Sequence, residues 1–80
     1  MSDGRARPEV ELFTQAHCTS CRRVARFLRE RGVEFTSRDV GEDPAALDEL
    51  TSRGYMSTPV TRIGEHWVAG FRKTEFERLL

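Results

Sequence analysis

Apolar residues in the first part of the chain follow two different spacings. The run from Val10 to Phe13 predicts a short strand. From Cys18 onward, apolar residues recur every three or four positions, which predicts a helix that ends near Gly32. The inner face of this helix is expected to consist of Cys21, Val24, Ala25 and Leu28.

A second strand and a second helix are predicted next. Val33 and Phe35 alternate with polar residues and begin the strand, with Val40 as its last inward residue. Asp43–Pro44 predicts a helix start, because Asp accepts hydrogen bonds from first-turn amides and Pro suits the first helical position. Gly54 is the expected end of this helix, and its inner face is expected to consist of Leu47 and Leu50.

The last part of the chain predicts a hairpin and a closing helix. The strands are expected at Val60–Ile63 and His66–Ala69, with the turn at Gly64–Glu65. Thr74 and Glu77 fit a capping box at the start of the helix. The buried stripe of that helix is expected to consist of Phe76, Leu79 and Leu80.

The order of these elements, β-α-β-α-β-β-α, predicts an α/β fold. The first βαβ unit requires parallel strands joined by a right-handed crossover, and the hairpin adds antiparallel strands. A four-stranded mixed sheet with helices on both faces is the economical arrangement. Residues 9–80 are expected to form one domain, preceded by a flexible N-terminal tail over residues 1–8.

Composition narrows the class of protein and its surroundings. The 80 residues include 13 Lys and Arg and 13 Asp and Glu, so the formal net charge of +0 gives no argument for a nucleic-acid or membrane partner. The polar N-terminal stretch has no apolar run, which argues against a signal peptide or an anchor. We therefore expect a cytoplasmic protein, in which paired cysteines are more often catalytic or metal-binding than structural.

The motif Cys18-Thr-Ser-Cys21 lies where the first strand leads into the first helix, a position suited to dithiol exchange. Amides at a helix N-terminus stabilise a thiolate and lower a thiol pKa from about 8.5. We expect Cys18 to attack a disulfide and Cys21, one turn further on, to resolve the mixed disulfide. Arg22 would add a favourable charge, whereas Arg23 is more simply explained as part of a solvated helix face.

Other readings of the cysteine pair remain open. A zinc site would need further ligands, for which the chain offers only His17 and His66. An iron–sulfur site would need more cysteines, and an inert core cysteine is a possible reading of Cys21. His17 is either a modulator of Cys18 or an exposed loop residue.

Taken together, the motifs resemble those of the glutaredoxin-like branch of the thioredoxin superfamily. The resemblance covers about residues 10–80 and rests on the cysteine motif, Thr58–Pro59, Gly70 and the element order. It implies that Pro59 is cis and faces the attacking cysteine. It also implies that the backbone of Thr58 pairs with an extended substrate peptide.

Within this branch, residues 54–60 and 66–72 look like those of the NrdH-redoxins. That resemblance implies electrons from thioredoxin reductase, class Ib ribonucleotide reductase as the target, and a substrate site of Thr58, Pro59, Gly70, Phe71 and Arg72. The stretch Gly70-Phe71-Arg72-Lys73 replaces the Gly-Gly-x-Asp-type segment of glutathione-dependent members, and a usual lysine is missing around Thr14 and Gln15. Unlike most NrdH-redoxins, the chain has Thr19 and Ser20 between its cysteines.

Three hypotheses follow. The first is a monomeric protein-disulfide reductase without a metal or cofactor. The second is a glutaredoxin reduced by glutathione or another small thiol, and the third is a non-catalytic thioredoxin-like binding or zinc module. Trp67 is expected either to dock a partner or to cover the sheet edge, and Phe71 is expected mainly to pack.

Overall fold

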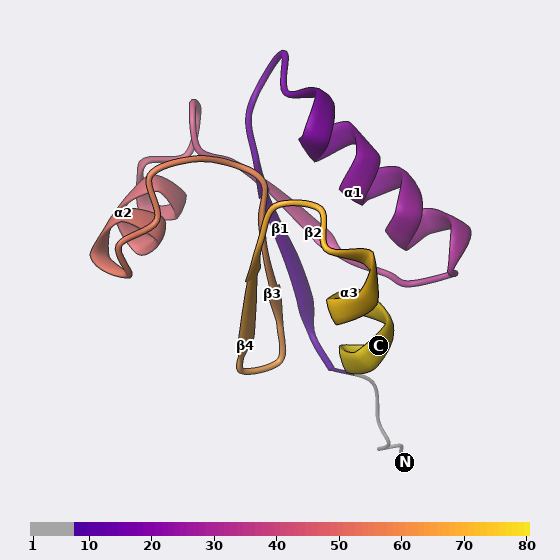
Figure 1. The fold of residues 1–80 in the computed structure, drawn as a ribbon. Helices are drawn as coiled ribbons and strands as arrows, with labels where there is room; N and C mark the ends of the chain where they lie inside the picture. Colours follow the sequence, from indigo (N-terminus) through magenta and orange to yellow (C-terminus); the bar gives the residue numbers. More distant parts are fainter. Residues whose placement is uncertain (1–7) are drawn as a thin grey trace.

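The computed structural model describes residues 8–80 and has its strands and helices in the predicted order (Figure 1). The predicted flexible tail of residues 1–8 lies outside the described residues except for Pro8. The elements are β1 Val10–Thr14, α1 Thr19–Glu30, β2 Thr36–Asp39, α2 Pro44–Ser52, β3 Val60–Ile63, β4 His66–Ala69 and α3 Lys73–Leu79.

The four strands form one mixed sheet in the order β2-β1-β3-β4. β1 pairs in parallel with β2, with Glu11 opposite Thr36, and antiparallel with β3, with Val10 opposite Ile63. β3 and β4 form the antiparallel hairpin. Helices α1 and α3 cover one face of the sheet and α2 lies on the other (Figure 1). The predicted α/β arrangement is confirmed.

The face under α1 and α3 holds the larger core. It consists of Val10, Leu12, Val24, Phe27, Leu28, Ile63, Val68 and Phe76. Phe27 is 8% exposed and joins this core, although the sequence pattern did not include it in the inner face of α1. Ala25, which the pattern did include, is only partly buried. The helix is therefore turned slightly further toward Phe27 than the spacing of its smaller apolar residues indicated.

The core under α2 is smaller and corrects one prediction. It consists of Phe13, Ala46, Leu50 and Val60. Leu47 is 45% exposed, so its predicted place on the inner face is wrong. The predicted start at Asp43 is confirmed, with Oδ1 accepting hydrogen bonds from the amides of Ala45 and Ala46. Residues 46 and 50 are one helical turn apart and face the sheet together, which points Leu47 away from it.

The second strand begins later than the apolar pattern predicted. Val33 and Phe35 pack against the larger core without belonging to β2. The amide of Val33 donates to the carbonyl of Leu28 at 2.9 Å, so it completes the end of α1 and does not enter a strand ladder. Gly32, with φ +70°, provides the predicted end of the helix. Pairing with β1 therefore starts only at Thr36.

The closing helix α3 also differs in detail. Its N-cap residue is Arg72, with no side-chain capping bond, so the predicted capping box at Thr74 and Glu77 is wrong. The helix starts at Lys73, so Thr74 already lies inside it and not at the N-cap position that a capping box requires. Of the predicted stripe, Phe76 is fully buried, Leu79 is partly buried and Leu80 is 40% exposed. A hydrogen bond from Arg78 lowers the pKa of Glu75, a carboxyl in the first turn.

On the face of the sheet that α2 covers, ion pairs connect the strands to one another and to α2. Glu11 on β1 accepts from Nε of Arg62 on β3 at 3.1 Å and lies 3.9 Å from Arg38 on β2. Arg38 also bonds Glu49 of α2 at 2.6 Å, a hydrogen bond that raises the pKa of Arg38. These contacts tie three strands and α2 together where the small apolar core ends.

Candidate active site

The cysteine motif lies at the end of the sheet where β1 leads into α1 (Figure 1). His17 has φ +60°, a left-handed conformation that is uncommon for a residue with a side chain, and it turns the chain into the helix. Cys18 is the N-cap residue, and its Sγ accepts a hydrogen bond from the amide of Cys21 at 3.1 Å. The two cysteines form a disulfide, with their Cα atoms 5.2 Å apart.

The two sulfur atoms have different surroundings. Cys18 is half-buried at the start of α1, whereas Cys21 is 2% exposed and faces inward with Val24. The first turn of α1 contains no acidic residue, so nothing there offsets the positive end of the helix dipole. When the disulfide is reduced, this arrangement can stabilise a thiolate at the accessible sulfur and shield the other sulfur from solvent.

Thr58 and Pro59 lie beside Cys18 although they are about 40 residues away in the chain. Sγ of Cys18 is 3.7 Å from Oγ1 of Thr58 and 3.9 Å from its carbonyl oxygen. The Thr58–Pro59 peptide bond is cis, which confirms the expectation from the family resemblance. The amide of Gly70 donates to the carbonyl of Pro59 at 2.9 Å. The structure thus brings the cysteine pair, Thr58 and Pro59 together, with Gly70 behind them.

Gln15 belongs to this cluster and was missed as a site residue. The hydroxyl of Thr58 donates to Oε1 of Gln15 at 2.9 Å. In the sequence, Gln15 was notable only because a usual lysine is missing there. The signal that could have marked it is its position three residues before Cys18, in the loop that faces Thr58.

Phe71 packs against the side of α1. It is 37% exposed and packs edge-on against Phe27, with ring centroids 5.6 Å apart. Phe27 is six residues beyond Cys21 on α1, which is about 9 Å along the helix. Arg72, which follows Phe71, is exposed and begins α3. The structure therefore places Phe71 beside α1 and Arg72 at the start of α3.

Trp67 packs on the α2 side of the sheet. Its ring stacks on Phe13 at 5.5 Å and on Tyr55 at 6.0 Å between centroids. The guanidinium of Arg53 lies 4.3 Å from the ring centroid, which adds a cation–π contact. Of the two roles considered for Trp67, these contacts favour covering the sheet.

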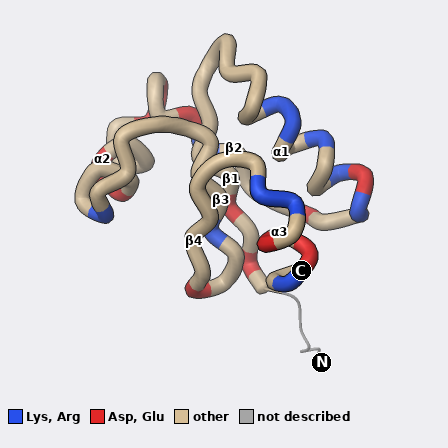
Figure 2. The backbone as a smooth tube through the Cα atoms, in the orientation of Figure 1, with Lys and Arg blue, Asp and Glu red and all other residues tan. Residues whose placement is uncertain are grey.

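His17 and Arg22 both have exposed side chains next to the disulfide. The backbone amide of Arg22 donates to the carbonyl of Cys18 at 3.2 Å, so its side chain leaves the helix in the first turns. Figure 2 shows further basic positions along α1 beyond this point. The exposed side of α1 that begins next to the cysteine pair is therefore basic.

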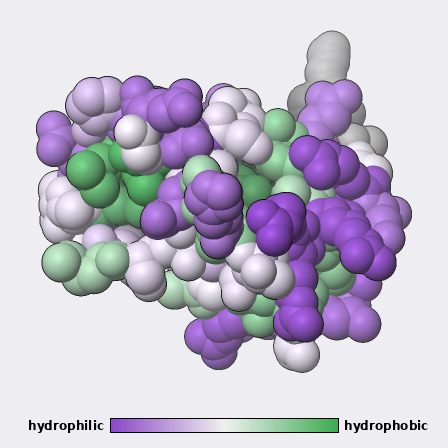
Figure 3. Space-filling view, turned by 90° about the horizontal axis from the view of Figure 1, so that it is seen from above, coloured by the Kyte–Doolittle hydropathy of each residue, from purple (hydrophilic) through white to green (hydrophobic). Residues whose placement is uncertain are grey.

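A small apolar hollow lies beside Gln15 and Thr58, on the α2 side. It has a volume of about 180 Å³ and is lined by Gln15, Val40, Leu47, Leu50, Thr51, Tyr55, Met56, Ser57 and Thr58. Met56 is 86% exposed and, with Leu47, gives this part of the surface an apolar character. Figure 3 looks down on the end that carries the redox loop and shows an apolar area on the side of α2. Thr58 therefore lies at the edge of an apolar hollow.

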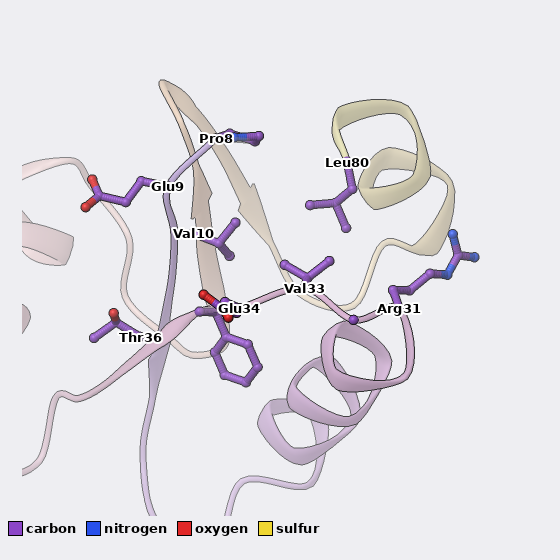
Figure 4. Close-up of a pocket in the computed structure, with 10 residues that line it drawn as sticks. Pro8, Glu9, Val10, Arg31, Val33, Glu34, Thr36 and Leu80 are labelled. Carbon is purple, nitrogen blue, oxygen red and sulfur yellow. The ribbon is translucent and has the colours of Figure 1, made fainter. Parts of the chain in front are cut away.

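A larger hollow, of about 710 Å³, lies at the other end of the molecule (Figure 4). Pro8, Val10, Arg31 and Leu80 contribute to its lining. Arg31 follows the last residue of α1, about 20 Å along the helix from Cys18. This hollow is therefore separate from the redox centre.

The described segment, residues 8–80, includes two histidines, His17 and His66. That part of the chain has no cluster of three or more His, Cys, Asp or Glu side chains that could hold a metal ion. His66 lies at the hairpin end of β4, opposite Ile63, and His17 lies at the redox end of the sheet. In the same described segment, every helix is too short or too polar to cross a membrane.

A cysteine pair at the start of α1, facing a threonine and a cis-proline on a four-stranded mixed sheet, defines a thiol–disulfide oxidoreductase of the thioredoxin-like fold. The glutaredoxin family model matches residues 10–68, and the chain belongs to this family. Within the family it is a redox protein of the NrdH type, as its relatives and structural neighbours show.

Two curated relatives illustrate this similarity. The glutaredoxin-like protein NrdH of Escherichia coli is 29% identical over 70 residues, which are 88% of this chain and 86% of that protein. The global transcriptional regulator Spx 1 of Oceanobacillus iheyensis is 42% identical over 41 residues, which are 51% of this chain and 31% of the regulator. The chain thus spans about a third of the regulator and most of the NrdH protein.

Solved structures give the same picture. The thioredoxin-like protein BC3987 superposes with a TM-score of 0.85 at 34% identity, covering 90% of this chain and 100% of that one. The NrdH-redoxin of Escherichia coli superposes with a TM-score of 0.84 at 28% identity, covering 90% and 95%. Both confirm the thioredoxin-like fold.

Proposed function

We propose that the protein reduces disulfides of a partner protein, with Cys18 as the attacking thiolate and Cys21 as the resolving thiol. The observation that carries this proposal is the unequal placement of the pair, with Cys18 half-buried at the N-cap and Cys21 2% exposed behind it. The Cys18 thiolate attacks one partner sulfur and expels the other as a thiolate. Cys21, after losing its proton, attacks the Cys18 sulfur and releases the second partner thiolate. The partner gains two electrons and the Cys18–Cys21 disulfide forms.

The partner peptide is proposed to lie along Thr58 and Pro59. The carbonyl oxygen of Thr58 is 3.9 Å from the Cys18 sulfur, so a strand that paired with this backbone would bring its own cysteine next to Cys18. Gly70, Phe71 and Arg72 are proposed to border the peptide on the α1 side. His17, Arg22 and Trp67 remain proposed modulators of the site, although the contacts of Trp67 favour packing.

The proposed electron source is thioredoxin reductase, and the proposed target is class Ib ribonucleotide reductase in the cytoplasm. The NrdH-redoxin of Escherichia coli is a glutaredoxin-like protein with a thioredoxin-like activity profile, and its fold matches this chain over 90% of its length. The uncharged Gln15 and the stretch Gly70-Phe71-Arg72-Lys73 also argue against ordinary glutathione binding. A dithiol donor must be kept reduced, which the cytoplasm provides.

An assay with purified thioredoxin reductase tests the electron source. The oxidised protein should consume NADPH in equimolar amount, because each disulfide accepts one pair of electrons. Reduction by glutathione, measured through glutathione reductase, should be much slower. Rapid reduction by glutathione with none by thioredoxin reductase would replace this proposal with that of a small-thiol-dependent glutaredoxin.

A Cys21→Ser variant tests the assignment of the two cysteines. It should lose multiple-turnover reduction of a protein disulfide and accumulate as a mixed disulfide through Cys18, which mass spectrometry detects as a covalent adduct. The matched Cys18→Ser variant should form no adduct with the same partner disulfide at the same pH, because its remaining thiol is buried. Adduct formation through Cys21 alone would reverse the assignment.

A further inference from the structure

The hydroxyl of Thr58 lies between two acceptors. Its oxygen is 2.9 Å from Oε1 of Gln15 and 3.7 Å from Sγ of Cys18. A hydroxyl group can accept two hydrogen bonds but has only one proton to donate. Gln15 and Cys18 therefore compete for the same proton.

The redox state decides this competition. In the disulfide, the Cys18 sulfur is uncharged and a weak acceptor, so the hydroxyl donates to Gln15 as observed. Two electrons and one proton convert the disulfide to a Cys18 thiolate and a Cys21 thiol. Hydrogen bonds to a charged acceptor are roughly twice as strong as those between neutral groups. After reduction, the thiolate is the better acceptor for the Thr58 proton.

The side chain of Gln15 can adapt to this change by rotating its terminal amide, while the rest of the side chain stays where it is. Its amide has an oxygen that accepts and a nitrogen that donates, and a half-turn about the last side-chain torsion exchanges them at little cost. In the turned position, Nε2 donates to the Thr58 oxygen and leaves the hydroxyl proton free for the thiolate. Gln15 is exposed, so no core packing opposes the rotation.

The need for this donor follows from another group near the sulfur, the backbone carbonyl of Thr58. The carbonyl oxygen of Thr58, 3.9 Å from Sγ, presents the negative end of its dipole and opposes a thiolate. The amide of Cys21, at 3.1 Å, provides one compensating hydrogen bond. The hydroxyl of the same Thr58 is well placed to provide a second.

We propose that Gln15 is a positioning residue of the dithiol centre: its side-chain amide turns over on reduction, so that the Thr58 hydroxyl donates to the Cys18 thiolate. Gln15 acts through Thr58 and does not touch the sulfur. The proposal depends only on thiol–disulfide exchange at Cys18 and holds for any partner or reductant.

A double-mutant cycle with Gln15→Met and Thr58→Val tests this inference. Met has about the length of Gln but can neither donate nor accept strongly, so Gln15→Met should leave the hydroxyl without its orienting partner. In the reduced protein, followed by the ultraviolet absorbance of the thiolate, the midpoint of the Cys18 titration should rise by about half a pH unit. At pH values below the midpoint, this rise lowers the thiolate fraction about threefold.

Thr58→Val should raise the titration midpoint at least as much, and Gln15→Met should add nothing in the Thr58→Val background. Thr58→Ser keeps the hydroxyl and should restore the wild-type midpoint. In a dithiothreitol redox buffer, the Gln15→Met variant should be about threefold less reduced than the wild type at the same buffer ratio. Ser52→Ala removes an exposed hydroxyl that donates to the carbonyl of Glu49 in its own helix, and it should change neither measurement.

Gln15→Glu separates charge from hydrogen bonding, because a carboxylate accepts but cannot donate. In the wild-type background, Gln15→Glu should raise the titration midpoint more than Gln15→Met does. In the Thr58→Val background, the rise caused by Gln15→Glu should be distinctly smaller than in the wild-type background. Additive effects of Gln15→Met and Thr58→Val, or an unchanged midpoint in Gln15→Met, would overturn the proposal. Circular dichroism of each variant establishes that it is folded, and Thr58→Ala takes the place of Thr58→Val in the cycle if the valine variant is not.

Discussion

Cys18 and Cys21 are three residues apart, and the start of α1 lies between them. The N-cap residue has its side chain outside the helix, where it accepts the Cys21 amide. Cys21 is already in the helix, on the face that Val24 and Leu28 continue into the core. The difference between an accessible and a buried sulfur is therefore a consequence of helix geometry. A helix that began one residue earlier or later would remove it.

Thr61 on β3 is a residue whose replacement should stabilise the fold. It is fully buried, and its hydroxyl has no hydrogen-bond partner among the described residues. Thr61→Val exchanges this hydroxyl for a methyl group of similar size, so the free energy of unfolding should rise by about 1 kcal/mol. Chemical denaturation measures this change. A loss of stability of the same size would mean that the hydroxyl is bonded in solution.

At the scale of whole elements, α2 depends on few contacts. It is nine residues long and contributes Ala46 and Leu50 to a core of four buried residues. Most of the stability of a short helix comes from packing, because the helix itself is marginal in water. The position of α2 should therefore be sensitive to the loss of one of its two inward side chains.

A matched pair of leucines tests this dependence. Leu50→Ala should lower the free energy of unfolding by about 2–4 kcal/mol, because Leu50 is 2% exposed and its removal leaves a cavity. Leu47→Ala, on the same helix but 45% exposed, should cost less than about 1 kcal/mol. Urea denaturation measures both. Equal losses would show that α2 is rotated relative to the described structure.

The local signals of the sequence predicted the elements well. Asp43 marked the start of α2, and Gly32 and Gly54 followed the ends of α1 and α2, because caps and left-handed glycines act within a few residues. The prediction that Thr74 caps α3 was wrong, since the helix begins at Lys73. Phe76 packs in the larger core, and this packing has more influence on the start of α3 than a single capping bond has. The prediction for Leu47 was wrong because a nine-residue helix offers two apolar faces. Either Leu47 and Leu50 or Ala46 and Leu50 could face the sheet, and the structure has the second pair.

The active site was predictable where a motif or a family resemblance marked it. The cysteine pair and the cis Pro59 belong to this class. Gln15 does not, because its contact with Thr58 joins residues 43 positions apart and exists only after the sheet has formed. The positions of Phe71 and Trp67 likewise depend on which face of the sheet each ring meets, and strand periodicity alone cannot assign those faces.

At the scale of the whole molecule, charge is balanced but unevenly distributed. The formal net charge is +0, yet α1 contains four arginines and a single glutamate (Figure 2). Arg22 and Arg23 are the members nearest to Cys18, and both are exposed. Such a local field attracts substrates of opposite charge even when the total charge is zero.

Charge reversal at Arg22 and Arg23 should therefore change substrate preference. The double variant Arg22→Glu/Arg23→Glu should reduce a peptide disulfide flanked by Asp and Glu about tenfold more slowly than the wild type at low ionic strength. A matched peptide flanked by Lys should be reduced faster. Both effects should shrink at 1 M salt, where charges are screened within about 3 Å.

Arg29→Glu is the control for this experiment. It lies on the same helix, about 10 Å further from Cys18 than Arg22, and should change the rates much less. Equal effects of Arg29→Glu and Arg22→Glu/Arg23→Glu would indicate a change in overall charge and not a local surface. An unchanged preference in both variants would exclude a role for these arginines.

Pro8 and Leu80 both line the hollow at the end of the molecule remote from the disulfide (Figure 4). Both ends of the described segment, Pro8 and Leu80, therefore lie on the side away from the cysteine pair. Attachment of the domain at Leu80 to a neighbouring protein, a bead or an electrode would leave Cys18 pointing outward. The fold is suited to work as a tethered module, in which orientation on a support requires no change near the reacting sulfur.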